Sequence, residues 1–532
     1  MILSNIDAII IVAYILLMIG IGYFVGRGNE TQEDYFLAGR SMSWFPIALS
    51  VAATMISCNA FIGGPGWGYE SGLLPFMQNI SVPFSIFISL TIFVPFLYSI
   101  KLTSIYEYIE LRLGKRTRLI SVVAFLVNSL IQVSSMVFIP ALVLNRFTGV
   151  DITIIIVAVV VISIIYTLLG GIKAVIITDA IQMIVIWGGV VGGIIYTFVV
   201  NDISFFETIK SAQEIGKLNA LDFSIETSII NENGFFAATI GGAVMWLRYF
   251  AFDQSQIQRL NTAKSIKDLK KSFVISGILM NLLFFIFVLL GALLFVVFKG
   301  VPFGNTNDVM ITFIQNLPVG LIGILLAGLF AAAMSSVDSI LNSMSTVFIK
   351  DIYEPHFSNG KEADLKLSMF ISALWGVLII FVTIIAFSGT TSSILAVIGQ
   401  YISYITGPSC AIFLLAMLTD KANDKGVSIG AIISFLIMIF VVRHFEITWM
   451  WNSIIGVVIT FVLGYLFSIL SKDKSTSENL KYTVKHHRQT LINENRVMED
   501  GVNVLPFKIG IYEVILLGFF ILQFGILFII SK

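Results

Sequence analysis

The chain has 532 residues, of which 57% are hydrophobic and only 12% charged, and its formal net charge is zero. A soluble domain keeps about a quarter of its residues charged, so this composition excludes an ordinary soluble protein and does not indicate nucleic-acid binding. The apolar residues form repeated runs of about 20, the length that crosses a bilayer as a helix. The chain is therefore predicted to be an all-α integral membrane protein.

The apolar runs predict about 14 transmembrane helices within a single domain that covers residues 1–532, because long apolar runs in lipid form helices that satisfy their own backbone polar groups. They are expected at 6–25, 43–70, 73–100, 117–145, 151–169, 174–200, 235–258, 272–298, 317–347, 366–388, 392–418, 426–442, 448–470 and 509–530. The first run follows no positive charge and precedes no small-residue cleavage site, so it is expected to be retained.

Lysine and arginine in the connecting segments predict the orientation. If the N-terminus is outside, most of the 32 basic residues fall on the inner side, including those in 101–118, 259–271 and 472–508. Both termini are therefore predicted to lie outside a multi-pass protein of the cell membrane. The acidic segment 201–234 is either a lid over the outer face or an ordinary solvated loop. The polar segment 471–508 is expected to be a flexible linker or a surface helix.

Two runs are expected to interrupt helices inside the membrane, where unwound backbone exposes carbonyl groups to cations. One is 50–67, with glycine and proline as helix breakers at 63–66, and the other is 241–254, which places glycines and charges deep in an apolar stretch. Each run opens a five-helix set, at 43–200 and 235–418, and this spacing fits an inverted repeat. The alternative is that glycine and proline only permit close packing.

Charged side chains inside the spans are candidates for function, because each costs about 2.5–3.5 kcal/mol to insert. Asp179 lies a few residues into its span and is either interfacial or functional. Asp338 lies at mid-span beside the hydroxyl groups of Ser335, Ser336 and Ser339, which share one side of a helix. Serines alone often bond to their own helix, but the added carboxylate favours a cation site.

Arg248 is the one basic residue inside a predicted span. It either pairs with Asp253, neutralises another buried carboxylate, or faces a central cavity. In the last case it would bind an anionic substrate, because a guanidinium group binds a carboxylate through two hydrogen bonds.

Several runs together resemble the sodium/solute symporter family, which includes sugar, sialic acid, proline, iodide, monocarboxylate and multivitamin transporters. They are EDYFLAGR, LTSIYEYIELR, GGIKAVIITDAIQ, FDQSQIQR and SSVDSILNS. The resemblance implies a LeuT-like fold of ten core helices in a five-plus-five inverted repeat. The peripheral helices would be 6–25, 426–442, 448–470 and 509–530. It also implies sodium as the co-transported ion.

The resemblance implies three sets of site residues. The common sodium site would use backbone carbonyls and two hydroxyls, from Ala53, Ile56, Ala332, Ser335 and Ser336. A second sodium site, present in some members, maps onto Asp179, Ser335, Asp338 and Ser339, where Asp338 replaces a serine. Substrate positions map onto Gln78, Asn79, Tyr249, Gln400 and Ser403, and Asn59 and Phe61 beside the break are added as lining residues.

The sugar-binding pattern is matched only in part, because Asn79, Trp246 and Met280 depart from it. The stretch 241–259 is more similar to the branch that carries anions, and Arg248 favours the same reading. The expected function is sodium-coupled import of an organic anion such as a monocarboxylate or sialic acid. The alternatives are a sodium/sugar symporter and a proton-coupled permease that uses Asp338.

Other classes of protein are not expected. The four histidines are scattered along the chain and form no catalytic cluster, so the chain is not expected to be an enzyme, and no segment is long enough for a signalling domain. The expected partners are a small-molecule solute and membrane lipid, with neither nucleic acid nor an obligate protein partner.

Overall fold

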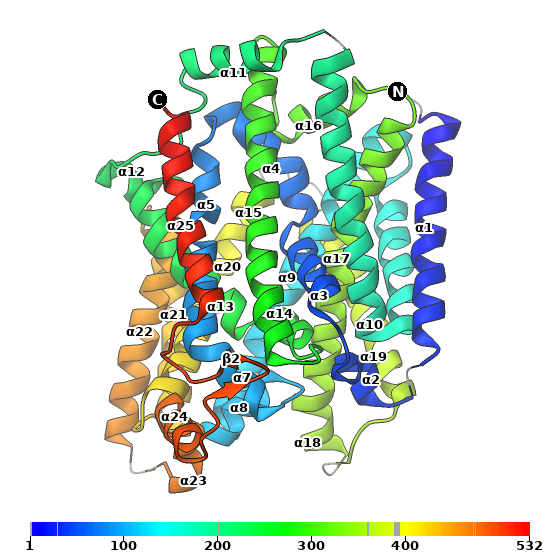
Figure 1. The fold of residues 1–532 in the computed structure, drawn as a ribbon. Helices are drawn as coiled ribbons and strands as arrows, with labels where there is room; N and C mark the ends of the chain where they lie inside the picture. Colours follow the sequence, from blue (N-terminus) through cyan, green and yellow to red (C-terminus); the bar gives the residue numbers. More distant parts are fainter. Residues whose placement is uncertain are drawn as a thin grey trace.

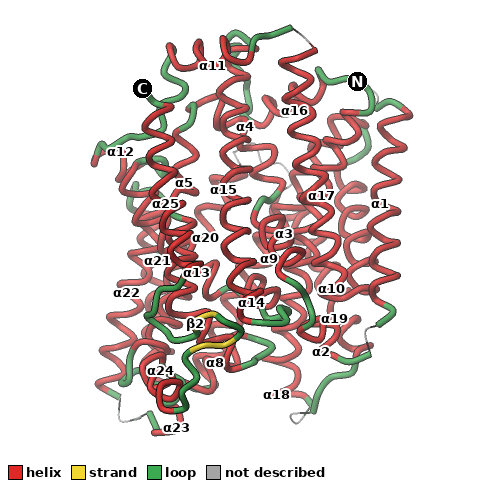
Figure 2. The backbone as a smooth tube through the Cα atoms, viewed as in Figure 1, coloured by secondary structure: helices red, strands yellow, loops and turns green. Residues whose placement is uncertain are grey.

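The computed structural model describes residues 3–28, 30–200, 202–358, 361–387, 394–471, 473 and 475–532, without the side chains of 200, 394–401 and 403. The fold is a bundle of long helices that run side by side (Figure 1). Figure 2 shows that helix makes up most of the described backbone and that the strands seen there form one short antiparallel hairpin.

In the first half of the chain the α-helices are α1 (Asn5–Gly26), α2 (Gln32–Leu37), α3 (Trp44–Met55), α4 (Cys58–Ser71), α5 (Met77–Ile80), α6 (Val82–Ile88), α7 (Val94–Ile100), α8 (Ile105–Arg112), α9 (Lys115–Thr148), α10 (Ile152–Ile195), α11 (Phe205–Glu214), α12 (Ile225–Ile230), α13 (Gly242–Phe252) and α14 (Gln254–Leu260). They are followed by α15 (Ile266–Val297), α16 (Asn307–Gln315), α17 (Leu321–Val347), α18 (Glu354–Phe357), α19 (Leu365–Phe387), α20 (Ile394–Leu418), α21 (Asp424–His444), α22 (Trp449–Leu470), α23 (Ser477–Leu480), α24 (Val484–Asn493) and α25 (Ile511–Ile530).

The remaining elements are short. The 3-10 helices are η1 (Ala38–Arg40) and η2 (Leu74–Phe76), and the π-helical turns are η3 (Ser89–Phe93), η4 (Tyr196–Val200), η5 (Ala237–Gly241) and η6 (Phe348–Tyr353). The hairpin pairs β1 (Met498–Glu499) with β2 (Val502–Asn503).

Ten helical segments of the described chain are long and apolar enough to cross a membrane, or eleven if the bent pair α3–α4 counts as one span. One of the ten, α10, is broken at Gly171, whose φ of 60° is left-handed. Tyr166, before the break, packs against Gly22 in the last part of α1, whereas Gly193, after the break, packs against Phe313 of α16 at the opposite end of the bundle. The two legs therefore run in opposite directions, as the two predicted spans 151–169 and 174–200 require.

The second predicted span is broken, and the break lies inside the predicted run 50–67. The helices α3 and α4 meet at an angle of 58°, and the residues between them are Ile56 and Ser57. The residues predicted to break the helix, at 63–66, lie inside α4, so this part of the prediction was wrong. The physical reason is that these residues serve helix packing.

Glycines bring the backbones of α4 and α15 into contact. A Cβ atom at Gly68 would overlap the carbonyl of Val288, and one at Gly291 would overlap the carbonyl of Pro65. At Gly64 a Cβ would lie 3.0 Å from the Cβ of Phe287. Small residues of this kind allow membrane helices to approach closely, which is the alternative that the sequence left open.

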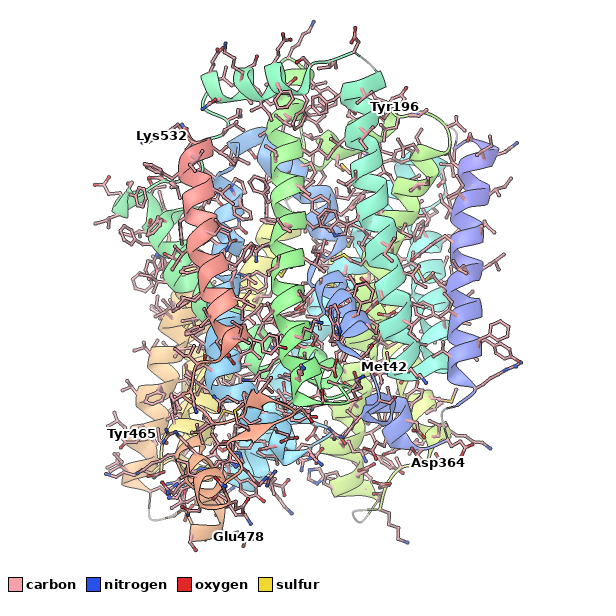
Figure 3. All side chains as sticks on the ribbon, in the orientation of Figure 1. Met42, Tyr196, Asp364, Tyr465, Glu478 and Lys532 are labelled. Carbon is pink, nitrogen blue, oxygen red and sulfur yellow. The ribbon has the colours of Figure 1, made fainter. Side chains whose placement is uncertain are left out.

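Both termini lie at one end of the bundle, together with α11, α12 and α16 (Figure 1). Figure 3 places Tyr196 and Lys532 at this end and Asp364 and Glu478 at the other. The predicted segment 201–234 is folded over its described residues, 202–234, at the first end, where Lys217 Nζ donates to the carbonyls of Tyr69 and Glu70 at 2.8 Å each. It is therefore more than a solvated loop.

The described residues of the segment 471–508, which are 471, 473 and 475–508, are also folded, at the opposite end of the bundle. They contain α23, α24 and the hairpin, and their contacts reach the short helix α8: Tyr108 donates to the carbonyl of Tyr482 at 2.9 Å and Asn479 donates to that of Leu111 at 2.8 Å. These contacts correct the expectation of a flexible linker.

Candidate functional site

Two interrupted helices bring backbone groups and charges to the middle of the bundle. The chain leaves α3 at Ile56, where φ is −86° and ψ is 78°, and starts α4 two residues later. It leaves α13 at Asp253, whose extended backbone ends one helix and whose side chain caps the next by accepting from Ser255 N at 2.9 Å. The second break lies inside the predicted run 241–254.

Four of the residues predicted for the common sodium site, Ala53, Ala332, Ser335 and Ser336, lie together where α17 crosses the end of α3. Ser335 Oγ lies 3.2 Å from the carbonyl oxygen of Ala53 and 3.3 Å from that of Ala332. Ser336 Oγ lies 3.2 Å from the same Ala332 oxygen and 3.3 Å from the carbonyl of Thr54. The structure thus gathers two hydroxyls and three carbonyl oxygens, all on buried residues.

Thr54 is a residue of this cluster that the sequence reasoning missed. Its hydroxyl also lies 3.5 Å from the carbonyl of Ser335 and 3.5 Å from the hydroxyl of Ser339. The predicted ligand Ile56 is buried at the break and lines the cavity described below. A hydroxyl residue just before a predicted helix break was the available signal for Thr54.

The predicted second site is a buried group of charges beside the first. Asp179 is fully buried inside the bundle. Its Oδ2 accepts from Ser50 Oγ at 2.6 Å and lies 3.5 Å from Arg259 Nη2. Asp338 accepts a hydrogen bond from Tyr166 and another from Ser339 Oγ at 3.1 Å.

Arg259 was assigned to an inner loop by the sequence reasoning, and this was wrong. Its side chain is fully buried, with Nε 2.9 Å from Ser50 Oγ. The polar sequence around Arg259 resembles that of a loop, but these polar side chains are buried and form hydrogen bonds inside the bundle. The partner Asp179 lies 80 positions away in the sequence, so only the fold shows the pairing.

A cavity of about 700 Å³ begins at the α3–α4 break. It extends to the connection between α21 and α22, where it is lined by Phe445, Glu446, Ile447 and Thr448. This connection lies at the same end as α12, because Thr448 N donates to the carbonyl of Ile229 at 2.9 Å. The cavity therefore opens toward the end of the bundle that carries both termini.

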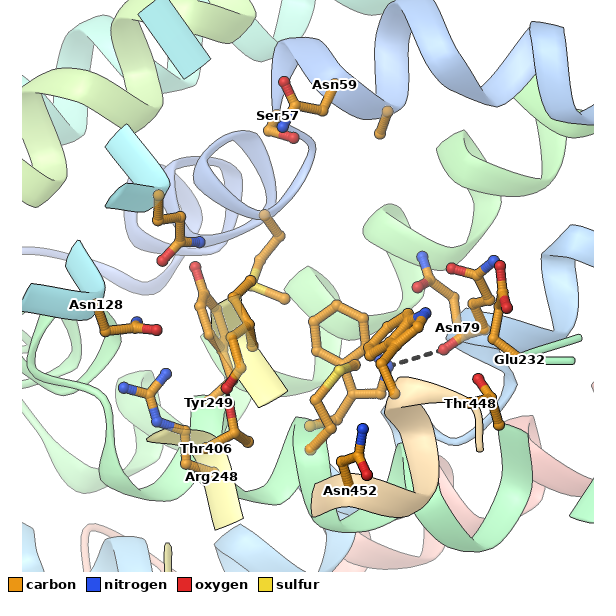
Figure 4. Close-up of a pocket in the computed structure, with 18 of the residues that line it drawn as sticks. Ser57, Asn59, Asn79, Asn128, Glu232, Arg248, Tyr249, Thr406, Thr448 and Asn452 are labelled. Atoms are coloured by element: carbon orange, nitrogen blue, oxygen red, sulfur yellow. Dashed lines mark hydrogen bonds between the residues drawn. The ribbon is translucent and has the colours of Figure 1, made fainter. Parts of the chain in front are cut away.

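Five of the predicted substrate residues line this cavity. They are Asn59, Gln78, Asn79, Arg248 and Tyr249. Figure 4 shows Arg248 and Tyr249 close to Asn128 and Thr406, with Asn79, Glu232 and Asn452 farther along the cavity.

The other predicted substrate residues have different outcomes. Phe61 is not among the lining residues, because it is fully buried against Phe287, with ring centroids 5.6 Å apart. The side chains of Gln400 and Ser403 lie outside the described part of the chain. Their neighbours on α20, Ile402 and Thr406, line the cavity.

The guanidinium group of Arg248 is the main charged feature in the depth of the cavity. Its Nη1 lies 2.9 Å from Asp253 Oδ2, and both side chains are about 95% buried. The pairing with Asp253 and the cavity-facing position, which the sequence reasoning treated as alternatives, are therefore both present. Trp246 adds an aromatic wall and donates to the carbonyl of Gln78 at 2.9 Å.

Comparison with known sequences finds relatives that are named as sodium-coupled transporters. The model of the family described as "Sodium:solute symporter family" matches residues 35–434. The human sodium-coupled monocarboxylate transporter 1 is 30% identical over 437 residues, which cover 80% of this chain and 70% of that protein. A sodium/sialic acid symporter of Proteus mirabilis is 27% identical over 499 residues, covering 88% of this chain and 98% of that protein.

Comparison with solved structures agrees. A Na⁺-coupled sialic acid symporter in a substrate-bound, outward-open state superposes with a TM-score of 0.80 at 25% identity, covering 89% of this chain and 99% of that chain. A transporter of the nucleobase-cation-symport-1 family superposes with a TM-score of 0.57 at 15% identity, which shows similarity of fold alone. These similarities confirm the helical, LeuT-like fold expected from the sequence, and they do not test the number of 14 helices.

Proposed function

Because the chain belongs to the sodium:solute symporter family, we propose that it carries a small organic anion into the cell together with sodium. Sodium is the co-transported ion, and the proposal concerns the chemical class of the solute that is carried with it. The observation that carries it is Arg248, a buried cation that lines the cavity. Burying an unbalanced charge is costly. Here the positive charge of Arg248 is neutralised by Asp253 and, in the proposal, by the anion that enters the cavity.

The chemistry of the cavity favours a carboxylate. A planar guanidinium group offers two parallel donors to a carboxylate, while Trp246 and Tyr249 provide apolar faces with polar edges. Relatives named for monocarboxylates and for sialic acid transport solutes that carry such a group. The sugar alternative is less well supported, because Met280 lines the cavity beside Trp246 and both depart from the sugar pattern.

A screen of purified protein tests the substrate class. Thermal stability would be measured with pyruvate, lactate, sialic acid, glucose and proline, each in sodium chloride and in choline chloride. We expect stabilisation by a carboxylate solute in sodium only, since a ligand that binds the native state raises its stability. Stabilisation by glucose alone would favour the sugar alternative, and Arg248→Gln should abolish the carboxylate effect.

We also propose that sodium binds between Ser335 and Ser336 on α17 and the carbonyl groups at the end of α3. Hydroxyl and unwound carbonyl oxygens suit sodium, and the helix that supplies the carbonyls borders the cavity. Sodium would thereby stabilise the arrangement that exposes the substrate site. A ligand shifts such an equilibrium only by its different affinity for the two states.

The substitution Ser336→Ala tests this site. The sodium concentration for half-maximal uptake into proteoliposomes should rise about tenfold, because a hydrogen bond to a charged group contributes roughly 1.5–3 kcal/mol and 1.4 kcal/mol corresponds to tenfold. The matched control is Ser345→Ala, since Ser345 is buried in the same helix and bonds to the carbonyl of Leu341 at 2.8 Å. Unchanged sodium dependence in Ser336→Ala would exclude the site.

Asp179, Ser335, Asp338 and Ser339 are proposed as a second cation site. A second sodium ion and a proton on Asp338 are the two candidates. Uptake measured against pH at fixed sodium separates them. In a proton-coupled carrier the uptake rate rises as the outer pH falls. In a two-sodium carrier the Hill coefficient of uptake for sodium stays above one.

The proposed topology has 14 spans in the cell membrane, the inverted repeat at 43–200 and 235–418, and both termini outside. In this orientation the cavity opens outward. We propose that the inner end is closed by contacts between α14 and α17, where Gln258 Nε2 donates to Asn342 Oδ1 at 2.8 Å and to Thr346 Oγ1 at 2.9 Å. Labelling of single cysteines near either terminus by an impermeant reagent in intact cells tests the orientation.

A further inference from the structure

The short helix α14 carries a buried ion pair at each end. At its start, Asp253 Oδ2 lies 2.9 Å from Arg248 Nη1, in the wall of the cavity. At its end, Arg259 Nη2 lies 3.5 Å from Asp179 Oδ2, in the proposed second cation site. All four charged side chains are buried. One helix of seven residues therefore touches both functional regions.

Ser255 connects the two ends of this helix. Its backbone N and its Oγ donate to Asp253 Oδ1 at 2.9 and 2.6 Å. Its carbonyl oxygen accepts from Arg259 Nη1 at 2.8 Å. The sequence of contacts Arg248–Asp253–Ser255–Arg259–Asp179, here called the α14 path, is thus continuous from cavity to carboxylate.

The two ends of the α14 path each hold a buried polar atom that finds no hydrogen-bond partner within the described residues. At the cavity end this atom is Arg248 Nε, a donor, and at the other end it is Asp179 Oδ1, an acceptor. Buried polar atoms are normally paired, so each exception calls for an explanation. A donor is suited to an anion and a carboxylate oxygen is suited to a cation, which matches the two solutes of a symporter.

We propose that Asp253 and Ser255 are positioning residues that couple occupancy of the cavity to cation binding at Asp179. An anion that engages Arg248 competes with Asp253 for the guanidinium charge. The start of α14 is then held less firmly, and Arg259, which is fixed to Ser255, moves with it. Asp179 loses part of its neutralising partner and binds sodium more tightly.

Coupling of this kind is reciprocal, so sodium at Asp179 also favours the anion at Arg248. The proposal rests on the proposed function, because it assumes that sodium binds at Asp179 and an anion at Arg248. It adds the residues that connect the two sites and the sign of the effect. A purely structural role for the ion pairs would predict altered stability with no communication between the sites.

The test uses the full-length protein in detergent, without any organic solute. Sodium chloride is titrated against choline chloride at constant ionic strength, and intrinsic tryptophan fluorescence gives the half-saturating sodium concentration. Arg248→Gln frees Asp253 as an anion would. We expect it to lower the half-saturating concentration about fivefold, the lower end of typical coupling between sites.

The deciding measurement repeats Arg248→Gln in the Asp253→Asn background. Asparagine still caps α14, since it is as good an N-cap as aspartate, but it removes the charge that responds to Arg248. If the α14 path carries the effect, Arg248→Gln now changes sodium affinity less than about twofold. If the effect is direct electrostatics between Arg248 and sodium, the fivefold change persists, and the proposal is overturned.

A matched control is a second buried ion pair away from both sites. Lys270 Nζ lies 2.7 Å from Glu513 Oε1, with both side chains buried. In the Glu513→Gln background, Arg248→Gln should keep its full effect on sodium affinity, which separates specific coupling from general loosening. A wild-type protein that shows no response to sodium would overturn this proposal and the sodium sites together, whereas a response that ignores Asp253 would overturn this proposal alone.

Discussion

At the scale of single residues, the buried guanidinium group of Arg259 is held by more than one partner. Arg259 contacts Ser50, Asp179 and the carbonyl of Ser255. Such sites are sensitive to the loss of one member, because an unpaired charge is left in a medium that solvates it poorly. Replacement of both charges removes that penalty.

Asp179→Asn should therefore lower the free energy of unfolding by about 3–5 kcal/mol, measured by chemical unfolding in detergent. The double variant Asp179→Asn/Arg259→Gln should recover a large part of this loss. The control is Glu33→Gln, which removes the exposed partner of Arg40 and should cost less than about 1 kcal/mol. Equal instability of the single and double variants would contradict this account.

At the scale of helices, packing between α4 and α15 depends on glycine. The carbonyl of Val288 occupies the space that a side chain at Gly68 would need. Gly518 on α25 offers a comparison, because an added Cβ there would meet nothing within 4 Å.

Gly68→Ala should thus lower stability by about 1–3 kcal/mol or more, as expected for overpacking, and should reduce uptake. Gly518→Ala should be neutral or slightly stabilising, since alanine is the better helix former. Both are measured by thermal unfolding followed by fluorescence. A stable, active Gly68→Ala variant would show that the two helices can separate without cost.

The sequence predicted the helices better than their breaks. Long apolar runs predicted the helical character of the chain and the ten or eleven long apolar spans of its described part, and charges within the runs pointed to Asp179 and Asp338, which are buried. The break at Ile56 lies inside the predicted run 50–67, but glycine and proline at 63–66, which dominate local propensity, do not form it. The break depends instead on a distant helix whose hydroxyls bond to the freed carbonyls. Arg259 was missed for the same reason, since its burial depends on a partner that only the fold brings near.

At the scale of the whole molecule, the described part of 471–508 lies at the end of the bundle opposite to both termini (Figure 1). Its helix α24 places His487 against α7, where Nε2 lies 3.0 Å from Ser99 Oγ and the ring meets that of Phe96 edge-on. Burial lowers the pKa of His487 below its ordinary value, and Arg496 acts in the same direction against Glu494. The docked segment therefore favours the neutral ring.

Since the pKa is lower in the docked state, protonation favours release. Docking should be strongest above about pH 6.5, the ordinary pKa of histidine, and should weaken as the pH falls below it. Limited proteolysis should show more cleavage within 471–508 at pH 5.5 than at pH 7.5. In the His487→Gln variant, cleavage should no longer differ between the two pH values, whereas in the His486→Gln variant the difference should remain. Comparison of the two variants also corrects for the pH dependence of the protease itself.

The backbone contact between α4 and α15 also restricts how the molecule can change shape. Helices whose backbones are in contact at glycines, as α4 and α15 are, cannot easily slide past each other. We therefore expect the two helices to move as one rigid body when the cavity closes. We expect the displacement to be concentrated at non-helical peptide units such as those at Ile56, Asp253 and Gly171. Ile56 and Asp253 border the proposed ion and solute sites, so the residues proposed to hold the cargo would also bend to release it.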